Sequence, residues 1–325
     1  MYKYIKTSFF RKFPKRFNEV KFYIMQDDKN FSNIDKNTSN EEIKSSKTDL
    51  IEKSNQKQSP FRKKFHVVSK LFLRWGPPIF ICIITFLLIG LCMYHAVIPL
   101  WLHGHKFFIL NSWSIFTFFF ILWMWCYFGL LFNDPGSMEN EVKYEPNHTC
   151  KTRCIHCQCY KPYRAHHCHR CGKCFARLDH HCEALGICIG LRNQKIFLLF
   201  IFYSILIIVI GCGILFYGGL VIPYDSFPFI IFLDIAMASL ICVMLIILLC
   251  QQIHKIFSGR TTFEYLFNIN VPCKPTALEN FEVLFGPRSN LLDWFIPNGT
   301  SPTWTSAFAW EKDRPTKDVT EIKRD

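Results

Sequence analysis

The stretch that decides the fold runs from residue 154 to residue 197 and reads CIHCQCYKPYRAHHCHRCGKCFARLDHHCEALGICIGLRNQKIF. Cys-x-x-Cys pairs begin at Cys154, Cys168 and Cys171, and histidines lie close to them. Thiolate and imidazole donors at such short spacing suit tetrahedral zinc. The spacing alone does not pair the ligands, because further donors lie in or beside the same stretch: Cys150, Cys159, His156, His166, His169 and His180.

Long apolar segments flank this stretch, two on each side, at roughly residues 77–100, 108–132, 196–222 and 227–251. Each is long enough for a membrane-spanning helix, which needs about 20 residues. With 50% hydrophobic and 17% aromatic residues, the chain is neither disordered nor an ordinary soluble enzyme. We therefore predict an all-α polytopic membrane protein whose four transmembrane helices carry a zinc-binding, cysteine-rich domain between helices 2 and 3. No internal repeat is evident.

The basic residues set the expected orientation. Lys and Arg crowd the segment before Pro77, the central loop and the segment after the last apolar run, whereas the short connections near 102–106 and 223–226 carry almost none. By the positive-inside rule, both termini and the Cys/His loop are cytosolic. Cytosolic thiols stay reduced, which favours metal ligation over disulfides among the chain's 16 cysteines.

The expected organisation has five parts. Residues 1–60 form a basic, largely disordered region, in which an aromatic and basic segment around Phe9 to Phe17 is either interfacial or disordered. Residues 61–132 hold helices 1 and 2, residues 133–195 the zinc domain, residues 196–252 helices 3 and 4, and residues 253–325 a cytosolic C-terminal region. The net charge of +13 lies beside the spans, so membrane lipids are expected partners. Nucleic acid is not, because no free recognition helix follows the ligands.

The run Cys-x2-Cys-x9-His-Cys-x2-Cys-x2-Cys-x4-Asp-His-His-Cys-x5-Cys-x4-Asn-x3-Phe resembles the cysteine-rich domain of the DHHC family of zinc-dependent protein S-acyltransferases, or palmitoyltransferases. The resemblance implies that one structural zinc is held by Cys154, Cys157, His167 and Cys174. It implies that a second is held by Cys168, Cys171, His181 and Cys188. Shorter pieces also resemble family motifs: Asp134-Pro135-Gly136, Thr261-Thr262-Phe263-Glu264, and Asn280 to Gly286.

With those eight donors assigned to metal, Cys182 and His180 remain in the Asp179-His180-His181-Cys182 run. An imidazole beside a thiol promotes the nucleophilic thiolate, and a carboxylate fixes the tautomer of the imidazole. We therefore expect Asp179, His180 and Cys182 to be catalytic. The implied reaction moves a long-chain acyl group, palmitoyl above all, from acyl-CoA through an acyl-enzyme at Cys182 to cytosolic cysteines of membrane-associated proteins.

Other residues are given supporting roles. The basic side chains of Lys161, Arg164 and Arg192 are candidate contacts for the CoA phosphates, with a solvated or lipid-facing charge as the equal alternative. We expect four polar residues to give structural support: Thr261, Thr262, Glu264 and Asn280. The short turn that begins at Thr261 could equally be a helix cap. Asp234 is expected to be a hydrated carboxylate at the membrane interface. Near the lumenal turn, we expect isolated interfacial histidines at His95, His103 and His105.

The chain departs from the family pattern at Glu183 and Ala184, where Pro-Trp is usual, and at Ile187, where Asn is usual. A carboxylate beside Cys182 is expected to disfavour the thiolate, unless Glu183 turns toward a basic residue such as Arg192. These departures keep open an alternative function, an inactive zinc-binding membrane scaffold of the same family. We expect the protein in the endomembrane system, with the Golgi or endoplasmic reticulum favoured over the plasma membrane.

Overall fold

The computed structural model describes residues 60–138, 154–157, 164–222, 228–269, 271, 276–286, 289 and 291–297. The chain divides into two compact units, Met1–Ser69 and Lys70–Asp325. Of the first unit, only the opening turns of one helix are described, so the fold given below is that of the second. The predicted disordered N-terminal region up to residue 59 and the candidate phosphate contact Lys161 lie outside the described residues.

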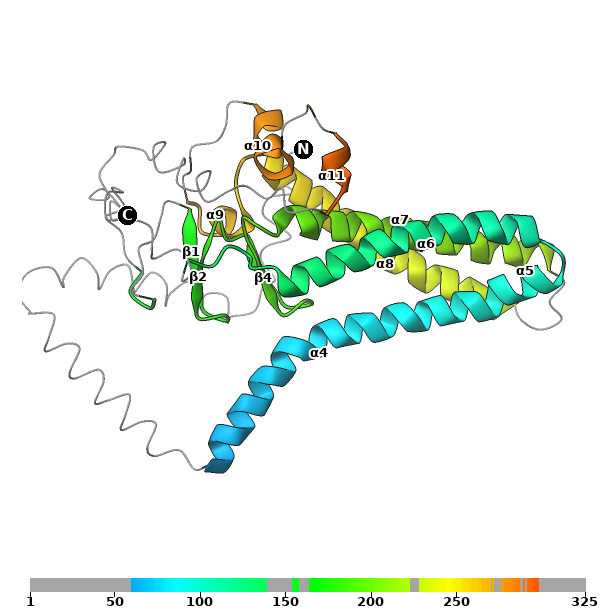
Figure 1. Cartoon of the computed structure of the whole chain (residues 1–325), viewed down its shortest axis with the longest axis horizontal. Helices are drawn as coiled ribbons and strands as arrows, with labels where there is room; N and C mark the ends of the chain where they lie inside the picture. Colours follow the sequence, from blue (N-terminus) through cyan, green and yellow to red (C-terminus); the bar gives the residue numbers. More distant parts are fainter. Residues whose placement is uncertain are drawn as a thin grey trace, which may run out of the picture. The chain divides into compact units, whose positions relative to one another are not determined.

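Four helices are long and apolar enough to cross a membrane: Trp75–Leu102, Lys106–Phe132, Gln194–Val221 and Phe229–Phe257. The first comprises most of α4 (Pro60–Cys92), a π-helical turn η2 (Met93–Val97) and α5 (Ile98–Leu102). The others are α6 (Lys106–Phe132), α7 (Gln194–Val221) and α8 (Pro228–Phe257), as Figure 1 shows. Uninterrupted helices satisfy every backbone polar group internally, as the bilayer requires. The four predicted spans are confirmed, with α8 continuing past the predicted end at residue 251.

Helix α7 is the centre of the helical part, because it packs against both α6 and α8. In the most apolar 18-residue stretch of α7, 50% of the residues are buried, whereas the share in the corresponding stretch of α8 is 6%. Aromatic side chains of α6 and α7, among them Trp123, Tyr127 and Phe200, form one buried apolar cluster. Within it, the indole nitrogen of Trp123 donates a hydrogen bond of 2.7 Å to Ser204 Oγ. The face of α7 toward α6 is therefore fixed by packing and by a specific polar contact.

The π-helical turn η2 places a polar pair inside the bundle. His95 Nδ1 lies 2.7 Å from Asp234 Oδ2 on α8, and the two side chains are only 9% and 16% exposed. The predictions of an isolated His95 and a hydrated Asp234 were therefore wrong, since each is the other's partner. His105 is not isolated either, because its Nδ1 lies 3.2 Å from the Tyr217 hydroxyl. His103 is exposed, as expected.

The loop between α6 and α7 contains two antiparallel β-hairpins that the all-α prediction did not include. The first pairs β1 (Ala165–Cys168) with β2 (Lys173–Ala176), and the second pairs β3 (His180–Cys182) with β4 (Ile187–Ile189). These strands of three or four residues are at or just above the usual minimum length for a strand. Their positions are set by the metal-ligand residues that they carry.

The Asp-Pro-Gly segment after α6 docks onto the end of β2, where the Ala176 N–H donates to the Gly136 carbonyl at 2.9 Å, and onto the residues that follow β4. Asp134 Oδ1 accepts hydrogen bonds from the backbone N–H groups of Gly136 and Ser137 at 3.3 and 2.9 Å, which forms a tight turn. The Pro135 carbonyl then lies so close to Gly190 that a Cβ there would come within 2.7 Å of its oxygen. Glycine at residue 190 is therefore required for this close approach.

Three short helices follow α8: α9 (Thr262–Leu266), α10 (Ala277–Phe285) and α11 (Leu292–Phe295). Helix α10 packs its Leu284 and Phe285 against Leu198 of α7 and Ile256 of α8. Asn280, on the same helix, is buried and donates a hydrogen bond of 3.3 Å to the Phe257 carbonyl. This contact agrees with the structural role predicted for Asn280.

Candidate functional site

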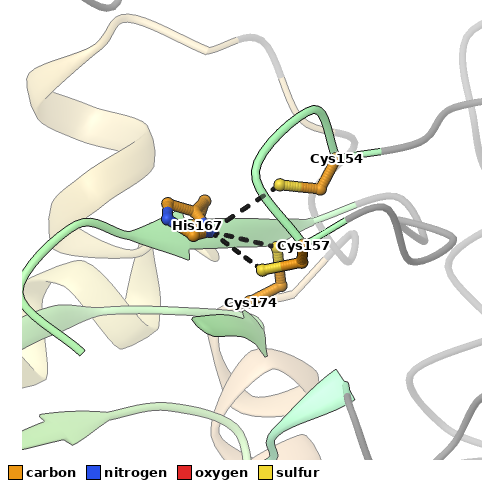
Figure 2. Close-up of side chains that lie close together, drawn as sticks. All are labelled: Cys154, Cys157, His167 and Cys174. Carbon is orange, nitrogen blue, oxygen red and sulfur yellow. Dashed lines mark hydrogen bonds between the residues drawn. The ribbon is translucent and has the colours of Figure 1, made fainter. Parts of the chain in front are cut away.

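The first predicted ligand set converges on one point (Figure 2). His167 Nδ1 lies 3.7 Å from Cys154 Sγ, 3.2 Å from Cys157 Sγ and 3.7 Å from Cys174 Sγ. A tetrahedral zinc with bonds of about 2.3 Å to sulfur and about 2.0 Å to nitrogen would place these atoms roughly 3.5 Å apart. The donor set and its spacing therefore fit one structural zinc ion.

The second predicted set has the same geometry. His181 Nδ1 lies 3.8 Å from Cys168 Sγ, 3.4 Å from Cys171 Sγ and 3.6 Å from Cys188 Sγ. Cys171 and Cys188 bring their sulfurs within 3.4 Å of each other. In both sets the four ligand atoms lie within 4.8 Å of one another. The structure thus brings together the eight residues that the resemblance assigned to zinc, paired as expected.

The two zinc centres are built alike, which sequence analysis missed when it found no repeat. In each set the histidine follows the two Cys-x-x-Cys residues by 13 and 10 positions and precedes the last cysteine by 7. In each hairpin the histidine on the first strand faces the last cysteine across the ladder, as His167↔Cys174 and His181↔Cys188. The same ligand spacing therefore occurs twice, and the two sets interleave, since Cys168 and Cys171 of the second precede Cys174 of the first.

Strand β3 separates a catalytic face from a metal face. Successive side chains on a strand point to opposite sides, so His181 faces the zinc centre while His180 and Cys182 share the other side. His180 Nδ1 lies 2.7 Å from Asp179 Oδ2, and Cys182 stands beside His180 on the same side of the strand. Burial disfavours the imidazolium, but the contacts with Asp179 and Cys182 outweigh it and raise the pKa of His180 to about 9. The three predicted catalytic residues are thus adjacent and linked.

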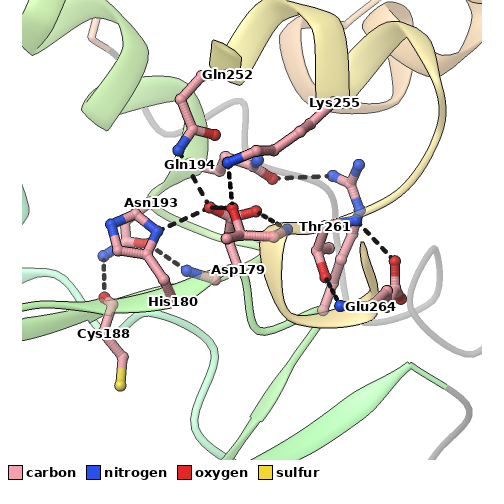
Figure 3. A network of polar contacts seen from close by, with 12 residues as sticks. Asp179, His180, Cys188, Asn193, Gln194, Gln252, Lys255, Thr261 and Glu264 are labelled. Carbon is pink, nitrogen blue, oxygen red and sulfur yellow. Dashed lines mark hydrogen bonds and ion pairs between the residues drawn. The ribbon is translucent and has the colours of Figure 1, made fainter. Parts of the chain in front are cut away.

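Asp179 is fully buried and surrounded by donors (Figure 3). Its Oδ1 accepts from the Thr262 N–H at 2.7 Å, and its Oδ2 accepts from the Thr262 hydroxyl at 2.8 Å and from Gln252 Nε2 at 3.4 Å. Burial alone would raise the pKa of this carboxyl, but the contacts with His180 and Thr262 lower it below its usual value. Asp179 therefore stays ionised and orients the His180 ring.

The Thr-Thr-x-Glu segment proves to be both a helix cap and a support. Thr261 Oγ1 accepts from the Glu264 N–H, and Glu264 Oε2 accepts from the Thr261 N–H, which completes a capping box for α9. The first turn of this helix faces Asp179, because the Phe263 N–H donates to the Asp179 carbonyl at 3.0 Å. The cap therefore presents Thr262 to the catalytic carboxylate.

Arg164 has a different place from the one predicted. Its guanidinium is buried, with Nε and Nη2 donating to Glu264 at 2.6 and 2.7 Å and Nη2 also donating to the Gly259 carbonyl at 2.8 Å. The prediction that Arg164 contacts CoA phosphates is therefore wrong. Although burial alone would raise the pKa of Glu264, His166 4.0 Å away and the hydrogen bonds from Arg164 hold that pKa well below its usual range. Arg192 remains partly exposed, 3.9 Å from Asp134, and stays a candidate phosphate contact.

Cys182 lies at the edge of the apolar helical core. It is partly buried and packs, together with its cross-strand partner Ile187, against the cluster formed by α6 and α7. Glu183 is 67% exposed and lies 3.1 Å from Arg170, so its ion-pair partner is Arg170 rather than Arg192, which the sequence had offered as an example. Cys182 thus has an apolar side and a solvent side.

Curated relatives are similar to this chain. The chain is 29% identical over 220 residues to "Probable protein S-acyltransferase 13" of Arabidopsis thaliana, covering 57% of this chain and 70% of that protein. It is 31% identical over 151 residues to "Probable protein S-acyltransferase 12" of the same plant, covering 39% and 52%. It is 32% identical over 157 residues to "Palmitoyltransferase ZDHHC15A" of Danio rerio, covering 44% and 47%. The matched region thus spans about half of the length of the last two relatives.

A family model described as DHHC palmitoyltransferase matches residues 147–269. This range contains both zinc centres, the Asp179, His180 and Cys182 group, α7, α8 and the capped turn of α9. The match, the relatives' names and the geometry agree. Over residues 147–269 the chain matches the DHHC palmitoyltransferase domain, and it is similar to proteins named as S-acyltransferases and palmitoyltransferases.

Proposed function

We propose that the protein is a protein S-acyltransferase that moves a long-chain acyl group, palmitoyl above all, from acyl-CoA to cysteines of membrane-associated proteins through an acyl-enzyme at Cys182. The observation that carries the proposal is the linked row of Cys182, His180 and buried Asp179 beside the apolar core of the helices. Both halves of an acyl-CoA, a polar head and an apolar tail, meet their preferred surroundings there.

In the first half-reaction, His180 takes the proton of the Cys182 thiol, and the thiolate attacks the carbonyl carbon of the acyl-CoA thioester. The bond between this carbon and the CoA sulfur breaks, and the CoA thiolate leaves with the proton from His180. Asp179 keeps the His180 ring oriented through its bond to Nδ1. The products are acyl-Cys182 and CoA.

In the second half-reaction, His180 takes the proton of a substrate cysteine, whose thiolate attacks the acyl carbon on Cys182. The bond to Cys182 breaks, and the released thiolate recovers the proton from His180. A thioester replaces a thioester, so the net change in free energy is small. The protein therefore needs only to bring the attacking thiol to the acyl carbon and to move one proton through His180.

The acyl tail finds an apolar path beside the nucleophile. Cys182 packs on the same cluster as Cys82 of α4 and Tyr127 of α6. Both of these residues also line an apolar cavity of about 520 Å³ between the two helices. Burying each CH₂ of a tail contributes about 0.8 kcal/mol. This continuity of apolar surface supports a long-chain donor over a short one.

The zinc ions would be structural. Bound by the two ligand sets, they would fix the hairpins that carry the catalytic row, because a loop with few apolar residues gains its stability from metal. The basic segments near the spans support cytosolic termini, and with them a catalytic face toward cytosolic acyl-CoA. We place this activity in the endomembrane system, with membrane lipids around the spans.

The test is incubation of purified protein with palmitoyl-CoA that carries a labelled acyl chain. We expect a hydroxylamine-labile label on Cys182, located by mass spectrometry, and none on the zinc-replete Cys182→Ser variant. A zinc-replete wild type that takes no label from acyl-CoA of any chain length would reject the proposal. Such a result would favour the inactive zinc-binding scaffold, which the Glu183 and Ala184 departures motivate.

A further inference from the structure

Two donors around Asp179 originate in a membrane-spanning helix. Gln252 and Lys255 lie one turn apart near the end of α8, on the same side of the helix, and Figure 3 shows both side chains directed at the carboxylate region. Sequence analysis gave neither residue a role. Their only signal was polarity at the end of an apolar span.

Gln252 is a polar side chain in a buried place. It is 2% exposed, and its Nε2 lies 3.4 Å from Asp179 Oδ2. Its Oε1 is buried and has no hydrogen-bond partner among the described residues. A buried amide with an unsatisfied oxygen destabilises a fold relative to an apolar residue of similar shape. The hydrogen bond to Asp179 is the stabilising contact that this buried side chain makes.

Lys255 determines the direction of a hydroxyl hydrogen. Its Nζ lies 2.7 Å from Thr262 Oγ1, and this oxygen lies 2.8 Å from Asp179 Oδ2. An ammonium group only donates, so the Thr262 oxygen must accept from Lys255 and give its own hydrogen to Asp179. The two hydrogen bonds therefore run in one direction only, from Lys255 to Thr262 and from Thr262 to Asp179. A positive charge also stands near the catalytic carboxylate.

We propose that Gln252 and Lys255 are positioning residues that tie α8 to the catalytic row. They hold Asp179 in the orientation that His180 requires, so the position of a membrane helix sets the reactivity of the Cys182 thiol. The inference rests on the proposed function in one respect, that Cys182 is the nucleophile. Neither residue touches the reacting atoms.

The test measures Cys182 reactivity in two ways on the zinc-replete full chain. The first is the rate of alkylation of Cys182 by iodoacetamide, followed by mass spectrometry, which needs no acyl-CoA. The second is the rate constant of acyl-enzyme formation and the KM for palmitoyl-CoA. The variants are Lys255→Met, Lys255→Arg and Gln252→Leu. The control is Gln251→Leu, because Gln251 is the exposed neighbour on the same helix.

We expect Lys255→Met and Gln252→Leu to slow both alkylation and acyl-enzyme formation by about tenfold, a fraction of what acid–base catalysis contributes. KM and zinc content stay at wild-type values, Lys255→Arg recovers most of the rate, and Gln251→Leu changes nothing. A rise in KM with normal alkylation would overturn the inference, because Lys255 would then bind the CoA phosphates. Slowing that always accompanies zinc loss, Lys255→Arg included, would also overturn it.

The same measurements separate this inference from the proposed function. A wild type whose Cys182 is alkylated quickly but never acylated would reject the acyltransferase. The alkylation rates of the variants would still decide whether α8 positions Asp179.

Discussion

Arg164 and Glu264 lie 100 residues apart in the chain and form a buried ion pair in which two guanidinium nitrogens meet two carboxylate oxygens at 2.6 and 2.7 Å. The pair joins the cysteine-rich domain to the turn that follows α8. Because Glu264 also caps the helix that presents Thr262, the ion pair fixes the support of Asp179.

Glu264→Gln is expected to destabilise this joint by about 3–5 kcal/mol, because the buried Arg164 charge loses its counter-charge. The measurement is the thermal unfolding midpoint in detergent, together with the rate of self-acylation. Glu183→Gln is the matched control, since it removes an exposed carboxylate. An unfolding midpoint equal to that of the control would show that the pair does not hold the two segments together.

His180→Ala and His181→Ala are expected to have different defects, although the residues are neighbours. His180→Ala keeps both zinc ions and lowers self-acylation by about 10²–10⁴-fold, because it removes the general base. His181→Ala loses the second zinc ion, because it removes a ligand. Metal analysis of the purified variants checks this. Equal zinc loss from both would show that the ligands are misassigned.

Glu183→Gln is expected to change the self-acylation rate by less than about threefold, in contrast to the increase at neutral pH that the sequence suggested for this substitution. Glu183 is largely exposed and pairs with Arg170, and exposed pairs of this kind are worth about 0–1 kcal/mol. The measurement is the rate at saturating acyl-CoA from mildly acidic to mildly alkaline pH. Arg170→Gln is the companion variant, because it removes the partner of Glu183. A large acceleration in Glu183→Gln would show that the carboxylate does reach Cys182.

The His95 and Asp234 pair is expected to stabilise the bundle through a specific coupling of about 1 kcal/mol, typical of polar contacts between membrane helices. His95→Ala, Asp234→Ala and the double variant form a thermodynamic cycle in detergent. His103→Ala serves as the control, because His103 is exposed. Strictly additive effects of the two substitutions would contradict the coupling.

The sequence predicted the parts of the molecule that follow from local pattern. The spans could be read because length and hydropathy alone define them, and Cys154 could be grouped with His167 because the resemblance carries the spacing. The β-hairpins escaped prediction because strands of three or four residues are too short to show a period.

The remaining features depend on which distant residues meet. Arg164 and Lys161 look alike in the sequence, yet only tertiary packing places Arg164 inside against Glu264. Gln252 resembles any polar residue at the end of a span until Asp179 is seen beside it. Asp234 pairs with His95, which lies on a π-helical turn of another span. The residues around Asp234 in the sequence give no sign of this partner.

The contact between Asp179 and Thr262 spans 83 residues, and α7 and α8 lie between them in the chain. A ribosome therefore releases Asp179, His180, Cys182 and all the predicted zinc ligands long before it releases the turn that holds Asp179. During synthesis the Asp179 carboxylate has no Thr262 donors until both final spans have been translated. Residues translated late thus complete the support of residues translated early.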